Sequence, residues 1–130
     1  MTENMVLEAV FQPDERVWLL GITLCMSEQK DELYCVFYDF DAGRLAVEKW
    51  PAEKPDWPFM LETERLCRVK RGQEIIFRLF RQGTVLEIYV TAADDGTALS
   101  TRLYDLKGGA FGVIAKGGNA EVRVFMSAIE

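Results

Sequence analysis

Two arginines and a glutamate in the middle of the chain have the types and spacing to form a charged cluster on a β-sheet. Arg78 and Glu87 lie inside the two halves of FRLFRQGTVLEIYV (77–90), which is typical of a tight hairpin. A two-residue turn that ends at Gly83 would place Arg78 directly opposite Glu87. If the acidic loop that follows is symmetric, the next strand places Arg102 opposite the same glutamate. We therefore predict that one carboxylate lies between two guanidinium groups on three neighbouring strands.

Two tyrosines, Tyr89 and Tyr104, flank this predicted ionic cluster of Arg78, Glu87 and Arg102. One interpretation is a structural clamp, because a one-residue slip of the pairing would send the charges into the core. The other is a sugar site, in which arginine N–H groups hold ring hydroxyls and a tyrosine packs on the apolar face of the sugar. Both interpretations put the cluster on the sheet face that is turned away from the core.

A second set of aromatic residues lies in the irregular stretch WPAEKPDWPFM (50–60). Its prolines keep the chain extended and argue against a place in a central strand. Trp50 and Trp57 could form an aromatic platform for a sugar ring or for a partner surface. They could instead be tucked inward from a connection that caps one end of the fold, since tryptophan is usually buried for its area.

The segments that must position these side chains are short and alternate with a period near two. Val, Ile, Phe, Tyr, Leu and Thr dominate them, and turn residues separate them. We predict strands at Val6–Phe11, Val17–Met26, Glu32–Phe40, Arg44–Lys49, Glu62–Val69, Gln73–Arg81, Thr84–Thr91, Ala98–Tyr104, Ala110–Ala115 and Ala120–Ile129. No helical period is long enough for a helix. Residues 1–130 are therefore predicted to form a single all-β domain, a two-sheet antiparallel β-sandwich.

Alternation along these strands also predicts which side chains are buried. In the central strands the predicted core face carries Ile75, Phe77, Leu79, Leu86, Ile88, Val90, Leu99 and Leu103. The opposite face mixes charges with aromatic rings, which is typical of a sheet that faces a ligand or is partly covered. In the last strand, the apolar side predicted to be buried consists of Val122, Val124 and Met126.

The composition narrows the functions open to the chain. A formal net charge of −6 argues against nucleic acid or an anionic membrane as the main partner, and no apolar run approaches a membrane span. The absence of histidine excludes a Ser-His-Asp triad and removes the commonest zinc ligand, so we expect neither a metal nor a cofactor. Cys25, Cys35 and Cys67 lie in apolar runs without a CxxC pair. They predict free, buried thiols rather than the alternative of a single disulfide with one spare thiol. Together with the absence of a signal peptide, they predict a cytoplasmic protein.

Several motifs in order resemble the C-terminal β-sandwich of glycoside hydrolase family 32, the invertases, levanases and inulinases. The hairpin is similar to that family's L-R-I-F-V-D-R-S-S-V-E-V-F-V segment. The identical positions are Arg78, Phe80, Glu87 and Val90. The segment STRLY (100–104) is similar to the family's T-S/T-R-I/L-Y, and GVIAKGGNAEV (112–122) is similar to its glycine-rich closing run.

The resemblance implies a jelly-roll sandwich of the concanavalin A-like kind and a non-catalytic role. The family's catalytic acids belong to an N-terminal propeller, whose W-M-N-D-P-N-G, R-D-P and E-C segments have no counterpart here. The first function that it implies is structural, with a sheet face packed on a propeller catalytic domain in the same chain or in a partner. The alternative is a stand-alone carbohydrate-binding module for a fructose-containing saccharide such as a fructan.

These functions differ in what the isolated chain should do. A packing module would expose an apolar patch and self-associate, whereas a sugar-binding module would bind its ligand as a soluble monomer. A hydrolase in its own right is the weakest of the three, because no pair of acids suits the two-carboxyl mechanism of a retaining glycosidase. We therefore assign no catalytic residue.

Overall fold

A computed structural model describes residues 4–25, 33–50, 63–66, 69–70, 72–93, 95–102 and 110–129, with only the backbone described for Cys25, Trp50 and residues 63–66. Strands β1 to β10 account for most of these residues, and each predicted strand overlaps one of them. Within the described ranges there is no helix, and so none long and apolar enough to cross a membrane. The all-β prediction is confirmed.

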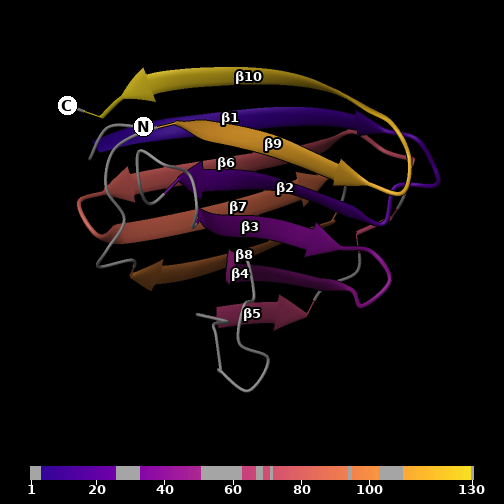
Figure 1. Cartoon of the computed structure of the whole chain (residues 1–130), viewed down its shortest axis with the longest axis horizontal. Coiled ribbons are helices and arrows are strands. Elements are labelled where there is room, and N and C mark those ends of the chain that lie inside the picture. Colours follow the sequence, from indigo (N-terminus) through magenta and orange to yellow (C-terminus); the bar gives the residue numbers. More distant parts are fainter. Residues whose placement is uncertain are drawn as a thin grey trace.

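The strands form two antiparallel sheets of five strands each, packed face to face as a sandwich (Figure 1). Sheet A has the order β10 (Ala120–Ala128), β1 (Asn4–Pro13), β6 (Ile75–Gln82), β7 (Val85–Ala92) and β8 (Asp95–Arg102). Sheet B has the order β5 (Thr63–Leu66), β4 (Arg44–Trp50), β3 (Leu33–Asp39), β2 (Leu19–Cys25) and β9 (Phe111–Lys116). The two-sheet sandwich predicted from alternation is therefore the observed fold.

The main core lies between the sheets, where the predicted inward faces of β6, β7 and β8 meet β2, β3 and β4. All the residues predicted for this face are buried except Leu103, which lies outside the described residues. Phe11 and Phe77 meet edge to face with their ring centroids 5.4 Å apart. Each such large side chain contributes about 1.5–3 kcal/mol on burial, so this layer holds the sheets at a fixed separation.

Strand β3 is buried on both of its faces, which gives sheet B a second apolar cluster on its outer side. Its buried members are Leu19, Cys35, Phe37 and Ala46. The guanidinium of Arg44 lies 5.5 Å from the ring centroid of Phe37, and it pairs with Glu48 at 3.2 Å. Cys35 is a free thiol, as predicted, and its burial raises its pKa to about 12. Cys67 lies outside the described residues, and the side chain of Cys25 is not described.

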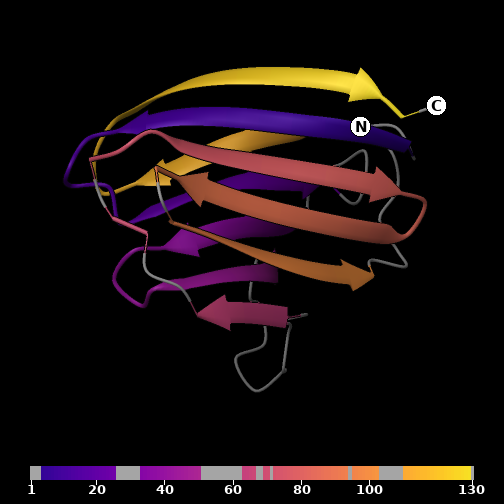
Figure 2. The same ribbon diagram turned by 180° about the vertical axis from the view of Figure 1, so that it is seen from behind.

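The last strand departs from the prediction that its apolar side is buried. Val122, Val124 and Met126 point to the inner side of sheet A, because they lie opposite Phe11, Ala9 and Leu7 of β1. Their exposed fractions are nevertheless 36%, 37% and 57%. Sheet A extends past β9 by this strand, as the two views from opposite sides show (Figures 1 and 2). Alternation gave the direction of these side chains correctly, but the offset between the sheets leaves them in solvent.

The connection between β9 and β10 is tied to the end of β1 by Asp14. The Asp14 carboxylate accepts hydrogen bonds from the backbone N–H groups of Arg16 and Asn119, both at 2.9 Å. The backbone N–H of Asp14 donates in turn to the Asn119 carbonyl at 2.8 Å. The hydrogen bond from Asn119 lowers the pKa of the Asp14 carboxyl below its usual value. This joint fixes the place at which the chain crosses from sheet B to sheet A.

Candidate functional site

The outer face of sheet A, which points away from the core, carries the charged and aromatic side chains of the predicted site. Its central residues on β1, β6, β7 and β8 are Val6, Glu8, Ile76, Arg78, Phe80, Val85, Glu87, Tyr89, Thr91, Ser100 and Arg102. The mixture of charges and rings predicted for this face is therefore present. Tyr104 of the predicted site lies outside the described residues.

The pairing of β6 with β7 differs by two residues from the prediction. Gln82 lies opposite Val85, so the turn consists of Gly83 and Thr84 rather than of Gln82 and Gly83. Gly83 has a φ of 60°, and no positive φ occurs at Thr84, which suits a hairpin turn with glycine at its first central position. The hairpin prediction placed glycine second, and this one-position error moves every cross-strand partner by two.

This register places Arg78 opposite Tyr89, and it places Glu87 opposite Phe80. The pairing of β7 with β8 is also two residues from the prediction, so that Glu87 faces Ser100, and Arg102 faces Val85. Strand β8 begins at Asp95, earlier than predicted, and Ala93 in the connection has a φ of 46°. The connection is symmetric, as the prediction assumed, but the pairing of Ala92 with Asp95 centres it one position earlier in the chain.

The predicted ionic cluster is consequently not formed. No ion pair joins Glu87 to either Arg78 or Arg102 among the residues that the structure describes. Arg78 instead pairs with Glu8 of β1, which lies directly opposite it, and the Arg78 Nε to Glu8 Oε2 distance is 2.6 Å. Across a β-ladder, a charged residue pairs most closely with an opposite charge that directly faces it. For Arg78 that residue is Glu8 on β1, whereas the facing residue on β7 is Tyr89.

The Glu8–Arg78 pair orients the guanidinium over the sheet. The side chains of Arg78 and Glu8 are 44% and 29% exposed. Only the Nε of Arg78 has a hydrogen-bond partner among the described residues. The two terminal nitrogens of a guanidinium carry four further N–H donors, so Arg78 keeps most of its donor capacity for a ligand.

Tyr89, Glu87 and Phe80 form the second half of the site. The Tyr89 hydroxyl donates a hydrogen bond of 3.1 Å to Glu87 Oε2, and this bond raises the pKa of the tyrosine above its usual value. The Phe80 and Tyr89 rings are perpendicular, with their centroids 5.6 Å apart. Since Tyr89 remains 39% exposed, its ring is both held in place and accessible.

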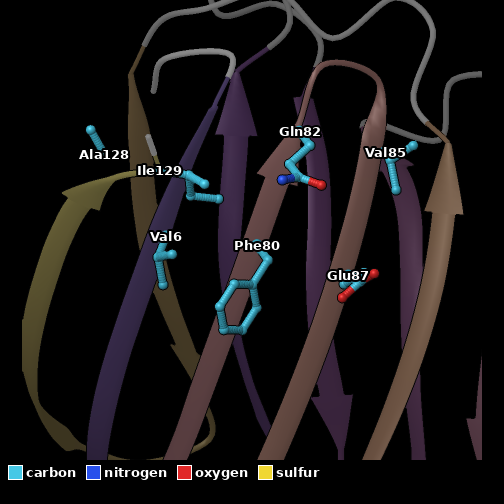
Figure 3. A pocket seen from close by; sticks show the side chains of 7 residues that line it. All are labelled: Val6, Phe80, Gln82, Val85, Glu87, Ala128 and Ile129. Carbon is cyan, nitrogen blue, oxygen red and sulfur yellow. The ribbon is translucent and has the colours of Figure 1, made fainter.

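Two shallow hollows adjoin on this face. One, of about 330 Å³, is lined by Arg78, Phe80, Glu87, Tyr89 and Thr91. The other, of about 440 Å³, is lined by Val6, Phe80, Gln82, Val85, Glu87, Ala128 and Ile129 (Figure 3). Phe80 and Glu87 line both hollows, and Figure 3 shows them side by side on adjacent strands. The two hollows therefore form one extended depression across β6 and β7.

Three of the five residues predicted for the ionic site come together here: Arg78, Glu87 and Tyr89. Arg102 lies on the same face but lines neither hollow. The other predicted aromatic platform lies beyond what the structure describes, because Trp57 is outside the described residues and only the backbone of Trp50 is described. No group of three potential metal ligands occurs among the described residues.

Sequence reasoning missed the contributions of Glu8 and Phe80. Glu8 is separated from Arg78 by 70 positions in the chain, so only the pairing of β1 with β6 shows that they meet. Phe80 was harder to recognise as a site residue, because its sequence feature is only an outward position between Arg78 and the turn. A ring flanked by charges on an outward face is a candidate ligand contact once the strand's neighbours are known.

Several solved structures have a similar sandwich fold. The chain resembles the carbohydrate-binding module CBM66 from Bacillus subtilis, with a TM-score of 0.69 and 10% sequence identity, over 98% of this chain and 76% of that one. It also resembles Caenorhabditis elegans galectin LEC-6 (TM-score 0.58, 14% identity, 99% of this chain and 84% of that one). For lactose- and MES-liganded congerin II the TM-score is 0.57 at 16% identity, over 95% and 90% of the two chains.

No family model and no curated protein sequence matches the chain. At identities this low, the likeness to solved structures concerns the fold and not the individual residues of a site. The chain thus has the two-sheet sandwich fold of a carbohydrate-binding module and of galectins.

Proposed function

We propose that the protein is a carbohydrate-binding module whose ligand lies on the outer face of sheet A. The observation that carries this proposal is the depression over β6 and β7, where an accessible tyrosine ring, a carboxylate and an oriented guanidinium meet. The fold shared with a carbohydrate-binding module and with a lactose-liganded protein supports it. The same two resemblances favour binding over a purely structural role.

The chemistry of the depression suits a neutral saccharide. A sugar ring presents C–H groups on its faces and hydroxyls around its edge, so it needs a ring to pack on and both donors and acceptors. Tyr89 and Phe80 supply the rings, Arg78 supplies N–H donors, and Glu87 supplies an acceptor. A hydrogen bond to a charged group is worth about 1.5–3 kcal/mol before the cost of association. Two or three such contacts on an open face predict weak binding, in the micromolar to millimolar range.

The identity of the sugar is the finer part of the proposal. The resemblance of the hairpin to fructan- and sucrose-cleaving enzymes makes a fructose-containing saccharide the first ligand to test. Lactose is the second, because a liganded structure of the same fold holds it. The alternative function, packing of a sheet face on a propeller catalytic domain, would cover the outer face of sheet A and hide Tyr89. In that case the propeller domain, and not a sugar, would contact these residues.

Isothermal titration calorimetry with fructose, sucrose, levan and lactose tests the proposal. Wild type should bind at least one of them, and Arg78→Ala should weaken that binding at least tenfold. Arg102→Ala is the matched control, since it removes an exposed arginine of the same face that lines neither hollow. Circular dichroism and thermal melting show that each variant is folded. Absence of heat with all four sugars in wild type, or equal weakening by both variants, would reject the site.

A further inference from the structure

The free edge of the sandwich at β9 and β10 forms a step that is apolar, regular and unpaired within the described chain. Strand β10 pairs with β1 without interruption from Ala120 to Ala128, and it has no proline or bulge. Its two charged residues, Glu121 and Arg123, lie on the outer side, so the inner side carries none of the charges, prolines or bulges that protect exposed edges from pairing with another chain. The inner side of β10 and the neighbouring β9 carry Val113, Val122, Val124 and Met126, each 36% exposed or more.

The backbone of β10 is available for pairing at the same residues. Asp14 donates to Asn119, and Ile129 donates to Asn4, which fixes the hydrogen-bonded pairs of the β1–β10 ladder. Bonded pairs alternate with non-bonded ones along an antiparallel ladder. The N–H and C=O groups of Val122, Val124 and Met126 therefore point to the open edge. Each of these residues has its apolar side chain on the inner side of sheet A, and its unpaired N–H and C=O groups point to the open edge of β10.

The opposite edge of sheet A, at β8, is protected against pairing with another chain. Strand β8 carries Asp95 and Gly96 at its start, and its inward Leu99 is only 6% exposed. Strands β4 and β5 of sheet B contact β8, so its inner side is covered. The step at β10 has no such cover from the described chain, and it is neutral on its inner side although the chain as a whole carries a net charge of −6.

We propose that this step is the interface of a symmetric dimer. In the dimer, β10 of each copy lies beside β9 of the other copy, in the space where sheet A extends past sheet B. Because the sheets of a sandwich lie about 10 Å apart, a strand placed beside β9 packs against the inner side of β10. A second copy, turned by a two-fold axis parallel to the strands, supplies such a strand with the same apolar side chains. Val122, Val124 and Met126 of the two copies then cover each other.

The direction of the strands fits this arrangement. Strands β9 and β10 are joined by the short connection 117–119 and run in opposite directions, as Figure 1 shows. A rotation about an axis along the strands keeps the direction of β10, so it would pair antiparallel with the β9 of the partner. Phe125, which is 53% exposed on the outer side of β10, would come beside β9, where Ile114 already packs on the outer cluster of sheet B. Simple edge-to-edge pairing of two β10 strands would leave the inner side chains in water.

Sedimentation velocity and light scattering of the full chain test the dimer without any sugar. Wild type should show twice the chain mass of 14.8 kDa as its concentration rises from micromolar to millimolar. Val124→Asp places two carboxylates against each other on the two-fold axis and should raise the dimer dissociation constant at least tenfold. Ala98→Asp, an exposed position on the protected edge β8, is the matched control and should leave the dimer unchanged.

A second variant keeps the test valid if Val124→Asp does not fold. Val124→Pro removes only an N–H that points to the open edge, so the ladder with β1 is retained while the partner's hydrogen bond is lost. Both Val124 variants should be folded by circular dichroism and monomeric. A wild type that stays monomeric at millimolar concentration, or folded Val124 variants that still dimerise, would overturn the proposal.

The dimer has a consequence that rests on the proposed carbohydrate function. The outer faces of the two A sheets would point in opposite directions, so one dimer would bridge two polysaccharide chains. Turbidity of levan or another bound polysaccharide should then appear with wild type and be lost with Val124→Asp. The affinity of Val124→Asp for a short saccharide should equal that of wild type. Loss of turbidity without a change of mass would contradict the dimer, whereas absence of binding in both proteins would contradict the carbohydrate function alone.

Discussion

The ion pair between Arg78 and Glu8 should be measurable as a coupling free energy, whereas Arg78 and Glu87 should show almost none. The Nε to Oε2 distance of 2.6 Å corresponds to an attraction of about 1.6 kcal/mol in bulk water and about 6 kcal/mol at an effective dielectric constant of about 20. Solvation of both side chains and their lost rotamer freedom offset most of this. Exposed pairs therefore retain about 0.2–1 kcal/mol. Because the two strands hold both side chains in direct register, we expect about 0.5–1 kcal/mol.

Two double-mutant cycles in urea measure these couplings. The first combines Arg78→Ala with Glu8→Ala, and the second combines Arg78→Ala with Glu87→Ala. The first coupling should fall by about half or more in 1 M NaCl, since the pair is partly exposed and salt screens it. The second should stay below about 0.2 kcal/mol. A second coupling as large as the first would show that the register of the hairpin is the one predicted from the sequence, and the reasoning about Glu8 would be wrong.

Further outcomes are expected at four positions. Asp14→Ala should lower the melting temperature at neutral pH. Because the folded-state pKa of Asp14 lies below its unfolded value, that difference should disappear as the pH falls through the folded-state pKa; a pH-independent difference would contradict the role of the carboxylate. Gly21→Ala should destabilise the fold by about 3 kcal/mol in chemical denaturation, since its Cβ would collide with the backbone carbonyl of Val36. Gly83→Ala should cost only about 1 kcal/mol, because its Cβ meets nothing and only the positive φ is strained. In a variant whose other two cysteines are serine, Cys35 should resist a thiol reagent at pH 8 until the protein is unfolded, and rapid labelling of the native state would show that its burial is wrong.

The strands and the two-sheet class of this fold follow from local patterns in the sequence. A period of two in the side chains is a local property, and it located all ten strands together with the inward residues of β6, β7 and β8. The same alternation placed Arg78, Glu87 and Tyr89 on one outward face. No distant contact was needed for these inferences, because the pleat of a single strand already separates its two faces.

Which outward residues touch one another depends on the pairing of strands that are distant in the chain. Register depends on the turns. Moving Gly83 from the second to the first turn position shifted the β6 partner of Glu87 by two residues, and the connection that follows Ala92 shifted its β8 partner by two as well. The partner of Arg78 comes from β1, because the chain order of the strands differs from their order in the sheet. The exposure of Val124 likewise depends on how far one sheet extends past the other, which no local pattern records. Alternation specifies the side of a strand, whereas the neighbours on that side follow from long-range pairing and from the stacking of the two sheets.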